Sequence, residues 1–144
     1  EPIPTKSTVV AQLVIGMAGR AADELFGDGA NAGAMHDLAN ATRCAAWARA
    51  RWGLYDSLSH KDEGAVDRAL SLDPDFARVV EEDLQRALAL ARAILSDQRN
   101  CVPALAEALL ERGVLDADEI AEIAGFTTRP IEPPDLPIAV KPDI

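Results

Sequence analysis

The spacing of apolar residues along the first part of the chain predicts a helix. Between residues 7 and 26, apolar side chains recur every three or four positions, which places them on one stripe of a helix. The stripe comprises Val10, Leu13, Val14, Met17, Ala18, Ala21, Ala22 and Leu25. Ser7 is the predicted N-cap, because the two prolines that precede it discourage an earlier start. Gly16 and Gly19 lie three positions apart, and we expect them to allow another backbone to approach closely.

A second helix is predicted over residues 34–52, where the same spacing continues and Gly53 supplies the stop. The residues near one face of this helix are Leu38, Ala41, Thr42, Ala45, Ala46 and Arg49. The clustered aromatic residues Trp47, Trp52 and Tyr55 could form a stacking platform, but local packing is the favoured interpretation. Residues 53–64 are predicted to be irregular, with one short extended piece around Leu58.

The clearest helix signal follows at residue 73. Asp73 is the predicted N-cap, and Pro74 occupies the first helical position. An apolar stripe then runs over about 20 residues, which corresponds to roughly 30 Å of helix. The stripe comprises Phe76, Val79, Val80, Leu84, Ala87, Leu88, Ala91, Ile94 and Leu95. The acidic stretch that begins at Val79, "VVEED", is interpreted as part of a solvated face.

Two shorter helices and a tail complete the predicted fold. One helix lies between Asn100 and Gly113, and the next begins at Asp116, which has capping-box spacing to Glu119. Five prolines occur beyond Gly125, and they cannot continue a helix. The sequence therefore predicts an all-α protein, a compact bundle of about five helices over residues 1–124. A proline-rich tail, extended or disordered, follows over residues 125–144.

The charge of the chain narrows the classes of partner. The formal net charge is −10, with 24 acidic and 14 basic residues, and no basic patch stands out. Nucleic acids and anionic membrane surfaces attract basic proteins, so neither is an expected partner. No run approaches the roughly 20 apolar residues that span a bilayer.

Three stretches, in the same order and spacing, resemble the C-terminal protease domain of the FtsH family, the membrane-anchored, ATP-dependent zinc metalloproteases of peptidase family M41. "GMAGRAADELFG" at 16–27 is similar to the family's "GGRAAEE" helix end. "GAMHDLANATRCAAWARARWGLYDSL" at 33–58 is similar to its "GASNDL" helix. "RALALARAILSDQRNCVPALAEALLERGVLDADEIAEI" at 86–123 is similar to its last helices, and the likeness covers about residues 8–124.

This resemblance implies that Asp37 is a zinc ligand. In the family, two histidines of an HExxH helix and a later aspartate of an "ND" step hold zinc, and Asp37 stands at the position of that aspartate. The residue-level alternative is an acid that only stabilises a helix start. His36 replaces the family's Asn; it points about 100° away from Asp37 on a helix and is not expected to bind metal. His60 is expected to be exposed in a polar loop.

Glu24 is a candidate carboxylate for orienting a zinc ligand, again by resemblance alone. The alternative is a surface ion pair with Arg20, four residues earlier on the same helix, which would stabilise the protein only slightly.

The HExxH pattern does not occur in these 144 residues. The start without Met and the retained Asp37 lead us to expect a cut piece of a longer protein that carries HExxH upstream. No catalytic residue is therefore assigned here, and the piece alone is expected to be inactive. The alternative is a helical assembly or adaptor module of an FtsH-like protein that has lost its zinc site. A weaker possibility is an unrelated helical bundle that merely echoes the family.

The resemblance also implies properties of the longer protein. Its cofactor would be zinc, and ATP would be bound by a separate module, since no Walker motif occurs in this chain. Its partners would be polypeptide substrates, unfolded or membrane proteins, and further copies of itself in a hexamer. It would contact the membrane only through other parts and work at the cytoplasmic face, whereas the piece itself would be soluble.

Overall fold

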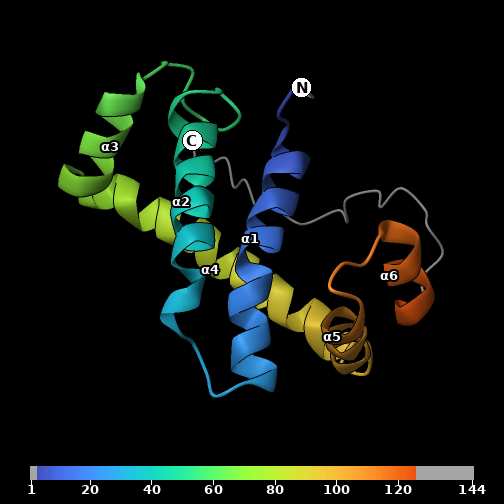
Figure 1. Cartoon of the computed structure of the whole chain (residues 1–144). Helices are drawn as coiled ribbons and strands as arrows, with labels where there is room; N and C mark the ends of the chain where they lie inside the picture. Colours follow the sequence, from blue (N-terminus) through green and yellow to red (C-terminus); the bar gives the residue numbers. More distant parts are fainter. Residues whose placement is uncertain (1–2, 126–144) are drawn as a thin grey trace.

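Six α-helices and one turn of 3-10 helix make up the described part of the chain, residues 3–125, in the computed structural model (Figure 1). In chain order they are α1 (Lys6–Phe26), η1 (Ala32–Ala34), α2 (Met35–Ala50), α3 (Glu63–Leu72), α4 (Pro74–Asp97), α5 (Cys101–Arg112) and α6 (Ala117–Ala124). No strand occurs within residues 3–125, so the all-α prediction is confirmed. The tail predicted from residue 125 onwards lies, after Gly125, outside the described residues.

The helix ends follow their local capping chemistry. Asp73 caps α4 as predicted, and its side chain accepts hydrogen bonds from the backbone N–H groups of Asp75 and Phe76. The predicted capping box at the start of α6 is also present. Helix α1 begins two residues earlier than predicted, because the N-cap is Thr5 rather than Ser7.

The prediction missed one helix, α3, which begins at Glu63, within the last two residues of the segment predicted to be irregular. Asp62 caps it by accepting a hydrogen bond from the Ala65 backbone N–H at 2.7 Å. Val66 is buried and Leu70 is partly buried against the core, so the apolar stripe of this ten-residue helix spans little more than one turn. The residues around Leu58 belong to no helix or strand, in agreement with the irregular segment expected there.

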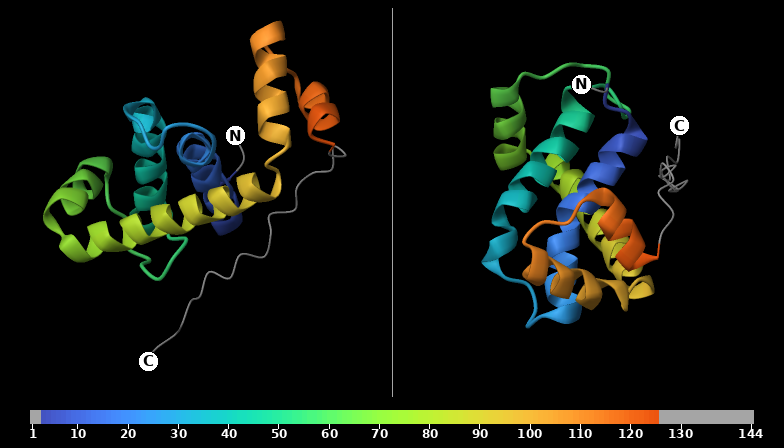
Figure 2. Two further views of the ribbon diagram at one scale, coloured as in Figure 1. Left: turned by 90° about the horizontal axis from the view of Figure 1, so that it is seen from below. Right: turned by 45° about the vertical axis from the view of Figure 1, so that its right-hand side comes forward.

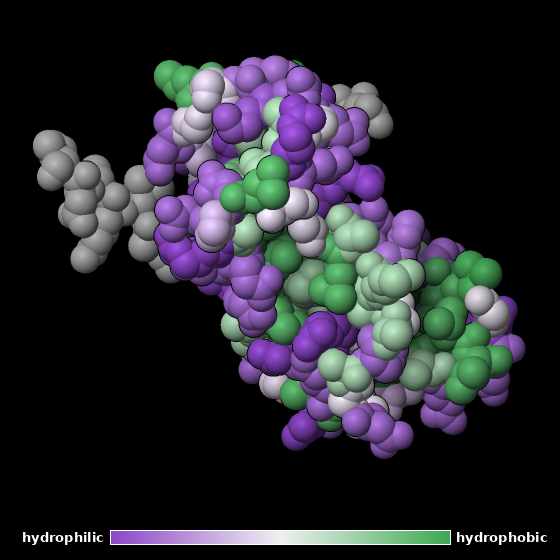
Figure 3. Space-filling view, turned by 90° about the vertical axis from the view of Figure 1, so that its left-hand side faces the viewer, coloured by the Kyte–Doolittle hydropathy of each residue, from purple (hydrophilic) through white to green (hydrophobic). Residues whose placement is uncertain are grey.

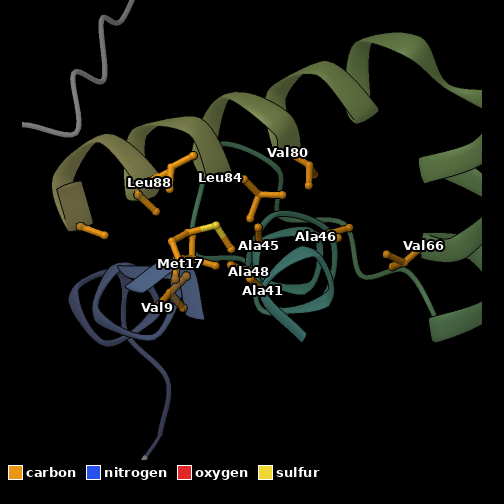
Figure 4. Packing of buried hydrophobic residues seen from close by; sticks show 14 of the residues in the cluster. Val9, Met17, Ala41, Ala45, Ala46, Ala48, Val66, Val80, Leu84 and Leu88 are labelled. Carbon is orange, nitrogen blue, oxygen red and sulfur yellow. The ribbon is translucent and has the colours of Figure 1, made fainter. Parts of the chain in front are cut away.

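The core lies where α1, α2 and α4 meet. Helix α4 crosses both of the other helices, which lie side by side on the same face of it (Figures 1 and 2). Larger side chains from α1 and α4 point towards small ones from α2 (Figure 4). The buried residues of this core are Val9, Leu13, Met17, Ala21, Ala41, Ala45, Ala46, Ala48, Ala50, Val66, Val80, Leu84, Ala87, Leu88 and Ala91. The five alanines of α2 allow its backbone to lie close to its neighbours.

Helices α5 and α6 form a hairpin that extends from the end of α4 (Figure 2). Neither helix contains a buried residue. Among the helices of residues 3–125, none combines the length and the apolar composition that a bilayer crossing requires.

Candidate functional site

Asp37 lies in the first turn of α2, close to α1. The turn η1 directly precedes this helix, and its N-cap Asn31 accepts a hydrogen bond from the Gly33 backbone N–H at 2.8 Å. Asp37 is exposed, and its carboxylate is directed towards α1: a Cβ placed on Gly19 would lie 3.9 Å from Oδ2 of Asp37. A carboxylate in a first helical turn is also stabilised by the helix dipole, by about 0.3–1 kcal/mol.

Gly16 and Gly19 lie on the side of α1 that meets α2, as the sequence suggested, but a methyl group at either position would make only ordinary contacts. A Cβ on Gly16 would lie 3.4 Å from the Cβ of Ala41 and 3.7 Å from the backbone oxygen of Asp37. Gly19, three positions further along α1, faces the Asp37 side chain. The Asp37 carboxylate thus lies exposed beside the glycine side of α1.

The chemistry of this carboxylate fits one ligand of a metal ion. Among the described residues, no hydrogen bond or ion pair engages the Asp37 side chain, so both oxygens are available for coordination. Zinc accepts carboxylate oxygen together with imidazole nitrogen, and catalytic sites use three protein ligands. Within residues 3–125, no group of three or more His, Cys, Asp and Glu side chains could hold a metal ion.

The structure does not bring the two histidines together with Asp37 into such a group. His36 is exposed beside Asp37. His60 is exposed as predicted, and its Nδ1 lies 3.1 Å from the backbone oxygen of Arg51 at the end of α2.

Glu24 joins two helices through arginine. Its Oε1 accepts a hydrogen bond from Arg20 at 3.0 Å, which is the pair expected within α1. Its Oε2 accepts from Arg92 on α4, a partner that the sequence analysis did not identify. The hydrogen bond from Arg92, and after it that from Arg20, lowers the pKa of Glu24 below its ordinary value of 4.5. The ion pairs therefore connect the C-terminal part of α1 to α4.

We predict that Glu24 makes the stability of the protein pH-dependent. Because its pKa is lower in the folded state than in the unfolded state, its contribution is present above about pH 4.5 and is lost as the pH falls through the folded pKa. In urea unfolding, the midpoint difference between wild type and Glu24→Gln should therefore shrink on acidification. When Arg92 is already replaced by Gln, Glu24→Gln should shift the midpoint less than it does in wild type. A midpoint difference that does not change with pH would contradict the assignment.

A second ion cluster, which the sequence analysis missed, lies between α2 and α4. Asp83 is 8% exposed and is the only buried charged residue of the described chain. Arg49 donates to both of its oxygens, from Nε at 2.6 Å and from Nη2 at 2.9 Å. Arg86 adds a third hydrogen bond at 2.7 Å. The Arg49 guanidinium also lies over the Tyr55 ring, 4.2 Å from its centre.

The interpretation of "VVEED" as a solvated face was wrong for Asp83. A signal was available: Asp83 stands three residues after Val80 and four before Ala87, and both of these belong to the apolar stripe of α4. An acid at that position has to face the core. A partner for its charge was therefore required.

The aromatic cluster packs locally, as the favoured interpretation held. The rings of Trp47 and Trp52 meet edge to face with their centres 5.9 Å apart. Arg51 covers the Trp47 ring at 4.4 Å, and burial raises the pKa of the Tyr55 hydroxyl. These contacts close the C-terminal end of α2.

Comparison with known proteins identifies the relatives of this chain. The sequence model of the family described as peptidase family M41 matches residues 1–123. An ATP-dependent zinc metalloprotease YME1 homolog of Caenorhabditis elegans is 34% identical over 131 residues, covering 83% of this chain and 18% of the relative. ATP-dependent zinc metalloprotease FtsH of Protochlamydia amoebophila is 30% identical, covering 78% of this chain and 14% of the relative. That of Thermus thermophilus is 27% identical, covering 91% and 22%. The chain thus spans about a fifth or less of these relatives.

Proposed function

Because the chain belongs to peptidase family M41, we propose that it is the C-terminal helical portion of an ATP-dependent zinc endopeptidase. In this proposal Asp37 supplies the third protein ligand to the catalytic zinc, and the histidines of an HExxH helix come from elsewhere in the longer protein. The observation that carries the proposal is the accessible Asp37 carboxylate at the contact of α1 and α2, which no described residue engages. The names of the similar proteins support the reaction class.

The role of this chain is to hold the carboxylate in place. Asn31 and the turn η1 fix the start of α2, and the glycine side of α1 lies beside the side chain. When bound, zinc would lower the pKa of its water ligand towards about 7 and polarise the scissile carbonyl. Glu24 lies on the same helix as Gly19, and we propose that its pairing with Arg92 keeps α1 in the position that the metal ligand requires.

The resemblance to the FtsH family suggests the remaining properties of the longer protein. We propose that it degrades polypeptides, that a separate module hydrolyses ATP, and that copies assemble into a hexamer. Its attachment to a membrane, with this portion on the cytoplasmic side, would use other parts of the protein. This chain alone is proposed to be inactive, since a catalytic zinc needs three protein ligands and the described residues offer one candidate.

The proposal predicts that Asp37→Ala in the longer protein abolishes zinc-dependent proteolysis. Loss of one of three ligands should lower zinc content and casein cleavage by at least about tenfold, while ATP hydrolysis remains. Metal content is measured by mass spectrometry, and cleavage is measured with and without a chelator. His36→Ala is the matched control, because it changes an exposed neighbour in the same helical turn.

Two results would contradict the proposal. Full zinc content and full cleavage in Asp37→Ala would show that Asp37 is not a ligand. A longer wild-type protein that binds no zinc would instead support the non-catalytic assembly module.

A further inference from the structure

The α5–α6 hairpin, residues 101–125, is held together as a unit. Arg112, near the end of α5, donates a hydrogen bond to Glu119 of α6 at 3.0 Å. At the other end, the Cys101 thiol donates to the backbone oxygen of Ala124, with the two atoms 3.4 Å apart. The two helices thus present one fixed surface.

The hairpin carries large apolar side chains that the described chain leaves exposed. Leu110 is 89% exposed and Val114 is 77% exposed, while Leu109 and Ile120 are 49% and 41% exposed. Figure 3 shows a broad apolar surface at the lower right, on the side towards which α5 projects from the bundle. The hairpin has no buried residue of its own.

The lengths of the two helices indicate that such a surface gains stability from being covered. Helix α6 has eight residues and α5 has twelve, and isolated helices this short are marginal in water. Most helical stability in proteins comes from packing an apolar face against another element. Contiguous exposed apolar surface is typical of interaction sites.

The distribution of charge indicates what kind of partner fits. Residues 101–125 contain six acidic residues and one basic residue, a net charge of −5. Residues 3–100 contain fourteen acidic and eleven basic residues, a net charge of only −3. The exposed Glu107 stands three positions before Leu110, on the same face of α5. The exposed Glu111 lies in the last turn of α5, and Val114 follows the C-cap Gly113.

A second copy of this chain would bring the same acidic surface to the contact. In a two-fold dimer both copies use the same patch, so like charges would oppose each other. In a ring the hairpin would meet another face of the neighbouring copy, and residues 3–100 of that copy also carry a net negative charge, −3. A cationic partner would meet opposite charges around an apolar centre, which is the arrangement that favours association.

From these observations we propose that the α5–α6 hairpin is a docking surface for a polypeptide segment whose apolar side chains are flanked by Lys and Arg. Leu110 and Val114 contact the apolar side chains of that segment, and Glu107 and Glu111 contact its cations. Helices with one apolar and one charged face bind in this way to apolar surfaces. This inference does not depend on the zinc site, because it uses none of the residues around Asp37.

Binding of a labelled amphipathic peptide made of leucine and lysine to the full chain tests the proposal. Fluorescence anisotropy should show binding that weakens as salt is added, and a matched leucine and glutamate peptide should not bind. Leu110→Ser/Val114→Ser should weaken binding by about tenfold or more. Leu72→Ser on α3 is the matched control: Leu72 is 78% exposed but lies outside the hairpin, so this change should not weaken binding.

Two charge-reversal variants distinguish the effect of the charges on the hairpin from the effect of the net charge of the chain. Glu107→Lys/Glu111→Lys should weaken binding by about tenfold. Asp28→Lys/Asp67→Lys changes the net charge equally at exposed positions outside the hairpin and should have a much smaller effect. Circular dichroism checks that all variants keep the wild-type helix content.

Three results would overturn the proposal. The first is no binding of the leucine and lysine peptide, and the second is equal loss of binding in the two charge-reversal variants. The third is self-association of the wild-type chain in sedimentation velocity that Leu110→Ser/Val114→Ser removes, since the occupant would then be a second copy.

Discussion

Replacing Asp83 with Ala is expected to lower the free energy of unfolding by about 3 kcal/mol. The change removes a carboxylate that accepts three hydrogen bonds from two arginines. Arg49 would keep its charge in a setting where its side chain is only 19% exposed, and a partly buried charge without a partner is costly. The effect should lie at the lower end for broken buried pairs, because Arg86 is 64% exposed and water can solvate it. Urea unfolding followed by circular dichroism measures the loss.

A double substitution distinguishes the ion pair from simple packing. Arg49→Met/Asp83→Leu removes both charges while keeping apolar volume between α2 and α4, so its stability should lie within about 1.5 kcal/mol of wild type. The double-mutant cycle is completed by the single variants Arg49→Met and Asp83→Leu. Its coupling free energy should be large, and its sign should be that of an attractive pair. A double variant that is less stable than Asp83→Ala would contradict this account.

Local signals were sufficient to predict most of the helices. Asp73 before Pro74, and Asp116 before Glu119, mark helix starts by side chains that satisfy free backbone N–H groups. The side of α1 that meets α2 could also be expected from Gly16 and Gly19. These features depend on residues a few positions apart, which a sequence displays directly.

The contacts between distant residues could not be predicted in the same way. Glu24 and Arg92 are 68 residues apart, and Arg49 and Asp83 are 34 apart. An acid on an apolar stripe shows that a partner must exist, but the packing of helices decides which arginine supplies it. Helix α3 is short and contacts the core mainly through Val66, which is buried, and Leu70, which is partly buried.

In the candidate site, too, local sequence signals explain only part of what the structure shows. Asp37 became a candidate zinc ligand only through resemblance to a family, since an acid in a first helical turn is common without any metal. The structure adds that its carboxylate faces Gly19 and has no described partner. Its remaining neighbours in a zinc site would come from other parts of a longer protein, beyond the reach of periodicity or spacing in this chain.

Met17→Ala is expected to lower the free energy of unfolding by about 2–4 kcal/mol. Met17 is 1% exposed and is among the largest fully buried side chains of the protein. It extends from α1 towards α2 and α4, beside Ala45 and Leu84 (Figure 4). A core formed by so many alanines has few side chains long enough to move into the space, so the cavity should persist and the loss should be large. Met17→Leu, which conserves volume, should cost less than about 1.5 kcal/mol in the same urea unfolding experiment. If both substitutions destabilised the protein equally, the thioether shape rather than the filled volume would determine the packing of α1. A loss below about 1 kcal/mol in Met17→Ala would show that the three helices close around the cavity, and the core would then be less rigid than its alanine contacts indicate.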